Sequence, residues 1–261
     1  MEMSVINTFT VQPFRGNPAA VCLLTEEKES IWMQLVAKEI NLPTTAFIHF
    51  TNHQWQLRWF TTTTEIPICG HGTLASASFL WEKGLISKDE VISFQTISGV
   101  LKARFVDGWV QLQFPAMLEE KTNPPELLLK ALGVQPVYIG RSQLDYLVEV
   151  ESEEMVRDLK PNIDLIAQLP VRGVIVTSPS KTNEFDFISR FFSPSHGIIE
   201  DYVNGSSHCC LGPYWKRRLN KTELTAYQAS ERGGILKVKV LDHNVILSGQ
   251  AVTIFEGKLF V

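Results

Sequence analysis

The chain has 261 residues, of which 44% are hydrophobic and 20% charged, an ordinary composition for a globular protein. A net charge of −4 and the absence of any lysine and arginine cluster argue against nucleic acid as the main partner. No stretch approaches the roughly 18 apolar residues of a membrane span. The first residues also lack the pattern of a signal peptide, so we expect a cytoplasmic protein that does not bind membranes.

The first half of the chain predicts short strands and two helices. Segments rich in β-branched and aromatic residues predict strands near 3–11, 19–24, 46–50, 56–61, 91–95, 99–106 and 109–114. A helix is expected over 30–40 from the helical spacing of Ile31, Leu35, Val36 and Ile40. A second helix is expected over 72–84, where small residues allow close packing and Gly84 can cap the end. Two adjacent prolines indicate a linker within 114–126.

The second half repeats this order. Strands are predicted near 137–150, 172–178, 184–192, 224–229, 235–241, 244–248 and 251–260. A helix is expected after Gly205 and through 209–219. Pro213 is unfavourable inside a helix, so a kink or a late start is expected there.

The two halves also match residue by residue, at an offset of 132 to 135. The matched pairs are Arg58 with Arg190, Phe60 with Phe192, Glu65 with Glu200, Gly70 with Gly205, Gln95 with Gln228, Leu101-Lys102 with Leu236-Lys237, and Asp107 with Asp242. One repeat at half the chain length indicates two related lobes rather than a solenoid. We place the lobes at 1–117 and 118–261, with the last strand, near 250–261, a candidate to pack back on the first lobe.

Each half carries a strand, a glycine and then a helix, in "EIPICGHGT" (65–73) and "EDYVNGSSH" (200–208). A helix N-terminus offers backbone N–H groups and partial positive charge, so it attracts a carboxylate. If the lobes face each other, both motifs meet in a cleft and form a site for a small anion. His71 and Asp201 would then act as general acid and base, and backbone N–H groups would stabilise the developing charge without a cofactor.

Each residue also has a structural interpretation. His71 alone could be structural, Cys69 could be a core residue, and Asp201 or Ser206 could serve as helix caps. Cys22 and Cys210 are interpreted as plain buried residues. A metal site at Glu65, Cys69 and His71 is disfavoured because no second ligand pair is evident.

Several stretches resemble the PhzF family of phenazine-biosynthesis-like proteins, which is related in fold to diaminopimelate epimerase and proline racemase. The resemblance rests on "FRGNPAAVCLL" (14–24), "LRWFTTTTEIPICGHGTLASASFL" (57–80), "EDYVNGSSH" (200–208) and "QASERGGILKVKV" (228–240). It implies an α+β fold of two pseudo-symmetric lobes, each a β-barrel-like sheet wrapped around a central helix, with the active site in the cleft between them. It also implies a homodimer and a cofactor-free isomerisation of dihydro-3-hydroxyanthranilate by proton transfer.

The resemblance assigns catalytic roles to His71, Asp201 and Ser206. Residues implied in substrate binding are Thr44, Gly70, Gly72, Thr73, Gly205 and Ser207. The family's proton-shuttling glutamate, however, is replaced by Thr44 within "NLPTTAF". Smaller departures are Asn7 for aspartate, Tyr202 for proline and Asn204 for threonine.

Two hypotheses follow. The first is a cofactor-independent isomerase or epimerase of a small carboxylated metabolite, in which His71 or Asp201, or less readily Cys69, supplies the missing base. The second is a catalytically impaired member that binds a small anion or a protein partner, because threonine cannot act as a carboxylate base. No metal or cofactor is expected under either.

Overall fold

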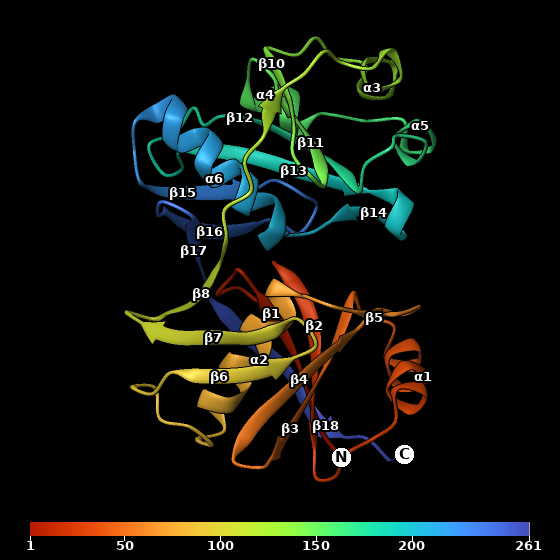
Figure 1. Cartoon of the computed structure of the whole chain (residues 1–261), viewed down its shortest axis with the longest axis vertical. Helices are drawn as coiled ribbons and strands as arrows, with labels where there is room; N and C mark the ends of the chain where they lie inside the picture. The colour runs from red at the N-terminus through yellow and green to blue at the C-terminus, as the bar shows by residue number, and fades with distance from the viewer. Residues whose placement is uncertain (261) are drawn as a thin grey trace. The chain divides into compact units, whose positions relative to one another are not determined.

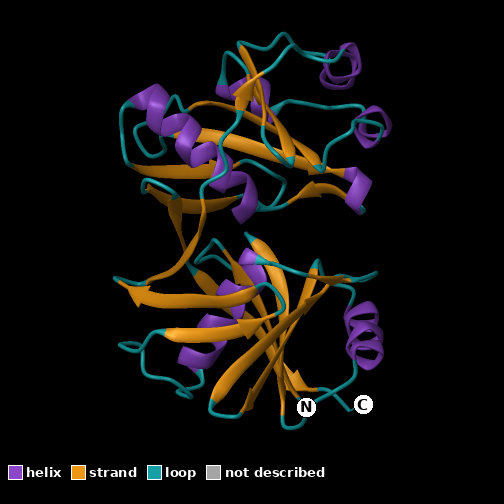
Figure 2. Cartoon of the chain, in the orientation of Figure 1, coloured by secondary structure: helices purple, strands orange, loops and turns teal. Residues whose placement is uncertain are grey.

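A computed structural model describes residues 1–260 and divides into two compact units (Figures 1 and 2). Unit 1 comprises Met1–Gln113 together with the chain from Ser248 onward, and unit 2 comprises Phe114–Leu247. Both units combine a sheet with few helices, as the predicted α+β class requires. None of the helices within residues 1–260 is long and apolar enough to cross a membrane.

Unit 1 contains nine strands and two helices among the described residues. Its strands are β1 (Glu2–Thr8), β2 (Asn17–Leu24), β3 (Thr44–Thr51), β4 (Gln54–Phe60), β5 (Glu65–Ile66), β6 (Ile92–Thr96), β7 (Gly99–Val106), β8 (Trp109–Pro115) and β18 (Ala251–Lys258). Its helices are α1 (Ser30–Ile40) and α2 (Gly70–Glu82). Because β18 pairs with β1 along its whole length, the end of the chain completes the sheet of unit 1.

Unit 2 contains the remaining elements. Its strands are β9 (Glu120–Lys121), β10 (Tyr138–Arg141), β11 (Asp145–Glu149), β12 (Gly173–Pro179), β13 (Phe187–Ser193), β14 (Ile198–Asp201), β15 (Glu223–Gln228), β16 (Gly234–Val240) and β17 (Asn244–Gly249). Its helices are α3 (Glu126–Leu132), α4 (Glu153–Arg157), α5 (Ile163–Ala167), the short η1 (Pro194–His196) and α6 (Gly205–Leu219).

The strand pairings of the two units follow one pattern. In unit 1, β2 and β3 are parallel, β3 and β4 antiparallel, β4 and β6 parallel, and β6 and β7 antiparallel. In unit 2, the same sequence of orientations joins β11, β12, β13, β15 and β16. The short strands β5 and β14 each add an antiparallel partner to the strand before them. The repeat seen in the sequence is therefore a repeat of topology.

One helix lies inside the sheet of each unit. Every residue from Gly72 to Trp81 of α2 is buried, as is every residue from Ser207 to Trp215 of α6. A helix buried on all sides must be enclosed by other elements, and α2 packs against β1, β2, β3 and β7. Figure 1 shows each of these helices beside the strands of its own unit. The expected central helices are confirmed.

The matched arginines and glutamates of the repeat form equivalent ion pairs. Arg58 donates from Nε and Nη2 to the two carboxylate oxygens of Glu65, both at 2.7 Å. Arg190 donates in the same way to Glu200, at 2.7 and 2.8 Å. Each pair joins a long strand to the short strand that leads into the central helix, so it fixes the approach to that helix.

The two pairs differ in their further contacts, and this predicts different stabilities. Arg190 also donates from Nη1 to the carbonyl oxygens of Val156, Arg157 and Leu159 at the end of α4, whereas Arg58 donates to Ser30 Oγ. The side chain of Arg190 is 13% exposed, whereas that of Arg58 is 26% exposed. Arg190→Met should lower the free energy of unfolding by about 3 kcal/mol, the lower end for removing one partner of a buried pair, because the pair is only partly buried. Arg58→Met is the matched control and should cost about half as much. Equal losses in urea titrations would contradict this prediction.

Three short helices of unit 2, α3, α4 and α5, were not expected from the sequence. They span five to seven residues, too few for a helical period to stand out. Their capping residues were a usable signal, because Ser152 and Asn162 accept backbone N–H bonds at the starts of α4 and α5. The predicted strand over 137–150 is a hairpin of β10 and β11.

The expected apolar face of α1 is wrong in part. Its buried residues are Met33, Val36 and Ala37, while Ile31 and Leu35 are 73% and 62% exposed. The helix has many apolar residues, so spacing alone did not single out the face that packs. The second expected helix ends as predicted. Gly84 at φ +65° follows the last turn of α2, and its N–H bonds to Trp81 O.

Pro213 lies inside α6, and the helix shows no late start. Proline lacks the N–H that would bond to the carbonyl four residues earlier, at Cys209. The backbone N–H of Met117 donates to that carbonyl at 3.0 Å. The connecting segment of unit 2 thereby supplies the hydrogen bond that the helix lacks.

Candidate active site

The first turn of α2 forms one candidate site, which we call the α2 site and define by Thr44, Cys69, His71 and Gly72. Cys69 is the N-cap residue, and its Sγ accepts the N–H of Gly72 at 3.4 Å. Cys69 Sγ also lies 3.4 Å from Nδ1 of His71 and 3.5 Å from Oγ1 of Thr44. The structure thus brings the predicted His71 and Thr44 together around a cysteine.

Glycine is required at position 72 by the closeness of these groups. A Cβ atom there would stand 2.7 Å from Trp59 Cδ1, 3.1 Å from the methyl group of Thr44 and 3.2 Å from Cys69 Sγ. Thr73, expected to bind substrate, is fully buried, and its hydroxyl donates to the carbonyl of Cys69 at 2.6 Å. Thr73 therefore stabilises the start of the helix in this structure.

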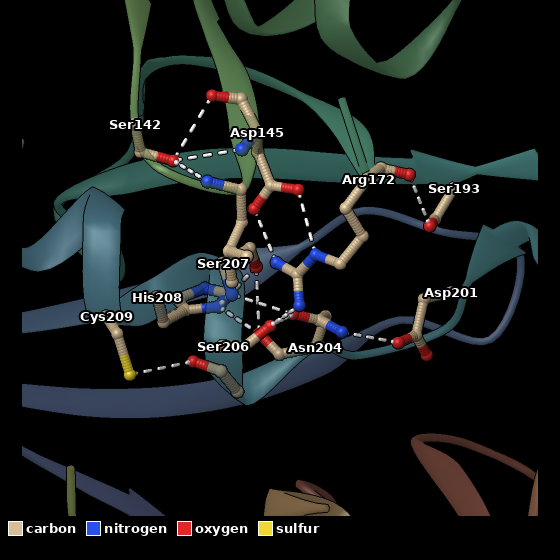
Figure 3. A network of polar contacts seen from close by, with 12 residues as sticks. Ser142, Asp145, Arg172, Ser193, Asp201, Asn204, Ser206, Ser207, His208 and Cys209 are labelled. Carbon is tan, nitrogen blue, oxygen red and sulfur yellow. Dashed lines mark hydrogen bonds and ion pairs between the residues drawn. The ribbon is translucent and has the colours of Figure 1, made fainter. Parts of the chain in front are cut away.

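The first turn of α6 forms the second candidate site, the α6 site, defined by Asp201, Asn204, Ser206 and Ser207 (Figure 3). The N-cap residue is Asn204, whose Oδ1 accepts the backbone N–H of Ser207 at 2.7 Å. The alternative interpretation of Asp201 or Ser206 as the cap is wrong. Ser206 Oγ instead donates to Asn204 Oδ1 at 2.8 Å, and Ser207 Oγ to Asn204 O at 2.9 Å.

The two helix starts repeat each other in detail. In both, the side chain of the cap residue accepts the N–H of the third helical residue. The side chain of the second helical residue contacts the cap side chain, and the side chain of the fourth lies within hydrogen-bonding distance of the cap carbonyl. His71 and Ser206 occupy the same place in the repeat. The sequence match at the two glycines therefore extends to the hydrogen bonds around them.

Asp201 ends β14 and is 8% exposed. Its Oδ2 accepts a hydrogen bond from Asn204 Nδ2 at 2.6 Å. Its backbone carbonyl accepts one from Nε2 of the fully buried Gln228, which also binds the N–H of Asn204 through Oε1. Gln228 was noticed in the sequence only as a partner in the repeat. It fixes the turn between Asp201 and the helix.

An ion pair between Arg172 and the buried Asp145 adjoins the α6 site. The sequence analysis did not predict it. Arg172 donates from Nε and Nη2 to the carboxylate of the fully buried Asp145, and from Nη1 to Ser206 Oγ at 2.7 Å (Figure 3). Burial raises the pKa of Asp145 above its usual range, and the Arg172 guanidinium opposes that shift. The pair forms because β11 and β12 are adjacent parallel strands, with Asp145 opposite Gly173. No local sequence motif predicts a pairing of this kind.

The other cysteines are buried in the core. All four cysteines are free thiols, and Cys22 and Cys210 are buried as expected. Burial raises the pKa of Cys22 to about 12, so its thiol stays protonated near neutral pH. Within residues 1–260, no group of three or more histidine, cysteine, aspartate or glutamate side chains is arranged to hold a metal ion.

Comparison with known proteins gives matches over nearly the whole chain. The family model described as phenazine biosynthesis-like protein (PhzC-PhzF) matches residues 6–257. An uncharacterized isomerase of Halalkalibacterium halodurans is 50% identical over 258 residues, covering 98% of this chain and 97% of the relative.

Solved structures agree with these matches. The crystal structure of a PhzF-family phenazine biosynthesis protein from Enterococcus faecalis superposes with a TM-score of 0.94 at 36% identity, covering 100% of this chain and 99% of that one. A Pseudomonas aeruginosa protein named as a predicted epimerase superposes with a TM-score of 0.74 at 17% identity, covering 100% of this chain and 99% of that one. The second likeness shows the fold alone.

Proposed function

The chain belongs to the phenazine biosynthesis-like protein family, and on that premise we propose that it is a cofactor-independent isomerase or epimerase of a small carboxylated metabolite. The observation that carries the proposal is the duplicated helix start, because in each copy an acid–base group contacts the side chain of the helix cap residue. His71 serves the α2 site and Asp201 the α6 site. Proton transfer by such groups contributes about 10² to 10⁴-fold each.

The two helix N-termini supply the groups that bind an anion. The cap side chains occupy the N–H of Gly72 and of Ser207, the third residue of each helix. The N–H groups of Gly70, Gly205 and Ser206 come earlier in the helices, where an anion is favoured by the partial positive charge of the helix end. At each helix start by itself, we assign these groups to the binding of a carboxylate or of the negative charge that develops as carbon loses its proton.

Cys69 is a further candidate for the missing base. Its Sγ lies between the Thr44 hydroxyl, where the family glutamate stands, and Nδ1 of His71. In this proposal Cys69 assists His71, and Cys69→Ser should reduce activity less than the loss of His71.

The second candidate function is binding without turnover, and the burial of Thr44 favours it. Thr44 is 1% exposed and brings no ionisable group to the α2 site. A protein with this site could hold a small anion, or use the same surface for a protein partner, without moving a proton. The two candidates differ in one measurable property, which is exchange of a carbon-bound hydrogen with solvent.

The test is deuterium uptake from heavy water. The protein is incubated with a panel of amino acids and cyclic hydroxy acids, and mass spectrometry measures deuterium at carbon. His71→Gln and Asp201→Asn keep the side-chain size and should each lower the uptake rate by about 10² to 10⁴-fold. The exposed residues His243 and Asp242 provide matched controls as His243→Gln and Asp242→Asn, which should leave the rate unchanged. A ligand that binds without any uptake supports the second candidate for that ligand class.

A further inference from the structure

A polar chain in unit 2 runs from the buried carboxylate of Asp145 to the carboxylate of Asp201 (Figure 3). Its links are Arg172, Ser206 and Asn204, and each is joined to the next by a hydrogen bond. The chemistry proposed above uses Asp201 and Ser206 but gives no role to the ion pair at the other end. The donor and acceptor roles along the chain suggest one.

The ion pair is held firmly at every side. The loop before Asp145 is closed by Ser142, whose Oγ accepts the N–H of Asp145 at 3.0 Å. The backbone of Arg172 is fixed by its N–H to Leu144 O at 2.7 Å, and its carbonyl accepts the hydroxyl of Ser193 at 2.7 Å. Its guanidinium also lies over the ring of Phe191, at 5.1 Å from the ring centre. Such a group can serve as a fixed reference for its neighbours.

The hydrogen bonds that link Asp145 to Asp201 allow only one order of donors and acceptors. A guanidinium can only donate, so Ser206 Oγ must accept from Arg172 and give its own proton to Asn204 Oδ1. The backbone N–H of Ser207 also donates to that oxygen, which independently fixes the orientation of the amide. Asn204 Nδ2 is then the group that faces Asp201, and an amide nitrogen can only donate to Oδ2.

We propose that the Asp145–Arg172 pair is a positioning element for Asp201, acting through the hydroxyl of Ser206 and the amide of Asn204. The pair keeps the amide oriented so that a donor always faces Asp201 Oδ2. The amide thereby holds the Asp201 carboxylate in one orientation through a hydrogen bond of 2.6 Å, as a positioned acid–base group requires. The proposal rests on the proposed function of Asp201, while the orientation of the amide can be measured without any substrate.

A purely structural role for the pair makes a different prediction. If the pair only joined β11 to β12, removing it would leave Ser206 Oγ donating to Asn204 Oδ1, and the amide of Asn204 would be unaffected. In a positioning role, Ser206→Ala and removal of the pair must have the same effect on that amide. The two roles are therefore separated by the response of the Asn204 amide to removal of the pair, with Ser206→Ala as the reference for a lost link.

The experiment compares three variants by ¹H–¹⁵N spectroscopy of the Asn204 side-chain amide, assigned by its loss in Asn204→Thr. Asp145→Leu combined with Arg172→Met removes both charges, so no single charge stays buried. Ser206→Ala removes the hydroxyl that links Arg172 to Asn204. Arg157→Met is the control because it breaks another ion pair of unit 2. The first two should speed exchange of the amide protons with solvent by about five- to tenfold, as loss of one net hydrogen bond implies. Arg157→Met should leave it unchanged.

Two results would overturn the proposal. One is an Asn204 amide that behaves as in the parent protein when the pair is removed. The other is a change on removing the pair but not in Ser206→Ala, which shows that the pair acts through the fold. In the deuterium assay, removal of the pair should lower kcat and leave KM unchanged, because the pair is not assigned to the substrate. If the amide responds as expected and no ligand exchanges, the proposed function fails and the positioning role stands.

Discussion

Replacing Thr44 by glutamate is expected to raise the rate of deuterium uptake by about 10² to 10⁴-fold, the contribution of one acid–base group. Thr44 Oγ1 lies 3.5 Å from Cys69 Sγ, which lies 3.4 Å from His71 Nδ1. A carboxylate on this strand position would therefore stand within the α2 site. Thr44→Glu should show the gain with ligands on which the parent protein is slow.

The same substitution should destabilise the fold. Thr44 is 1% exposed, and its methyl group would be 3.1 Å from a Cβ atom at Gly72, so little room exists for a longer side chain. Overpacking of this kind costs about 1–3 kcal/mol, measurable as a lower midpoint in urea. Thr44→Gln is the matched control, with the same size and no basic group. Equal rates for the two variants would mean that the carboxylate contributes nothing to proton transfer.

Lowering the pH from 6.5 to 4 is expected to remove about 3 kcal/mol of stability through His208 alone. Burial lowers the pKa of His208 from 6.5 to about 4. Its Nδ1 lies 2.7 Å from the carbonyl of Asn204, and Nε2 is buried with no hydrogen-bond partner among the described residues. The ring also stacks on Phe187, so a second proton would enter an apolar site.

The sign follows from proton binding in the two states. Between pH 4 and 6.5, the unfolded chain binds a proton at His208 and the folded chain does not. The free energy of unfolding therefore rises with pH across this window and its full contribution is present above pH 6.5. His208→Phe should be less stable at neutral pH for want of one hydrogen bond, but its stability should fall less on acidification.

Urea titrations at pH 7, 5.5 and 4.5 measure this difference, and His243→Gln is the control on an exposed histidine of the same unit. The control should follow the parent protein at all three values. A parallel decline of the parent and His208→Phe would show that the acid sensitivity arises elsewhere.

The repeat in the sequence predicted more of this molecule than any single motif did. Arg58 matched Arg190 and Glu65 matched Glu200 in the sequence, and the structure shows that the matched residues form two ion pairs of the same geometry. Matching Gly70 with Gly205 located the starts of both central helices. These features could be read because they depend on short segments whose spacing the sequence preserves.

Other features depend on tertiary contacts and could not be predicted from the sequence. Asp145 and Arg172 are 27 residues apart and meet only because two parallel strands align. Asparagine before a helix is a common cap, so the role of Asn204 was partly predictable. The family resemblance, however, identified Asn204 only as a replacement for threonine. The hydrogen bond from Met117 that accommodates Pro213 has no counterpart in local sequence.

The ion pairs at Arg58 and Arg190 also indicate which positions can be changed, because equivalent residues of the two units can be compared within one chain. Both copies retain the arginine, the glutamate and the glycine, and they differ at the cap, which is cysteine in one and asparagine in the other. The ion pair and the glycine, which form a frame common to the two units, are thus the same in both, while the cap residue differs. New specificities within such a chain are best sought by changing Cys69, Asn204 and the residues that touch them, and by leaving the frame intact.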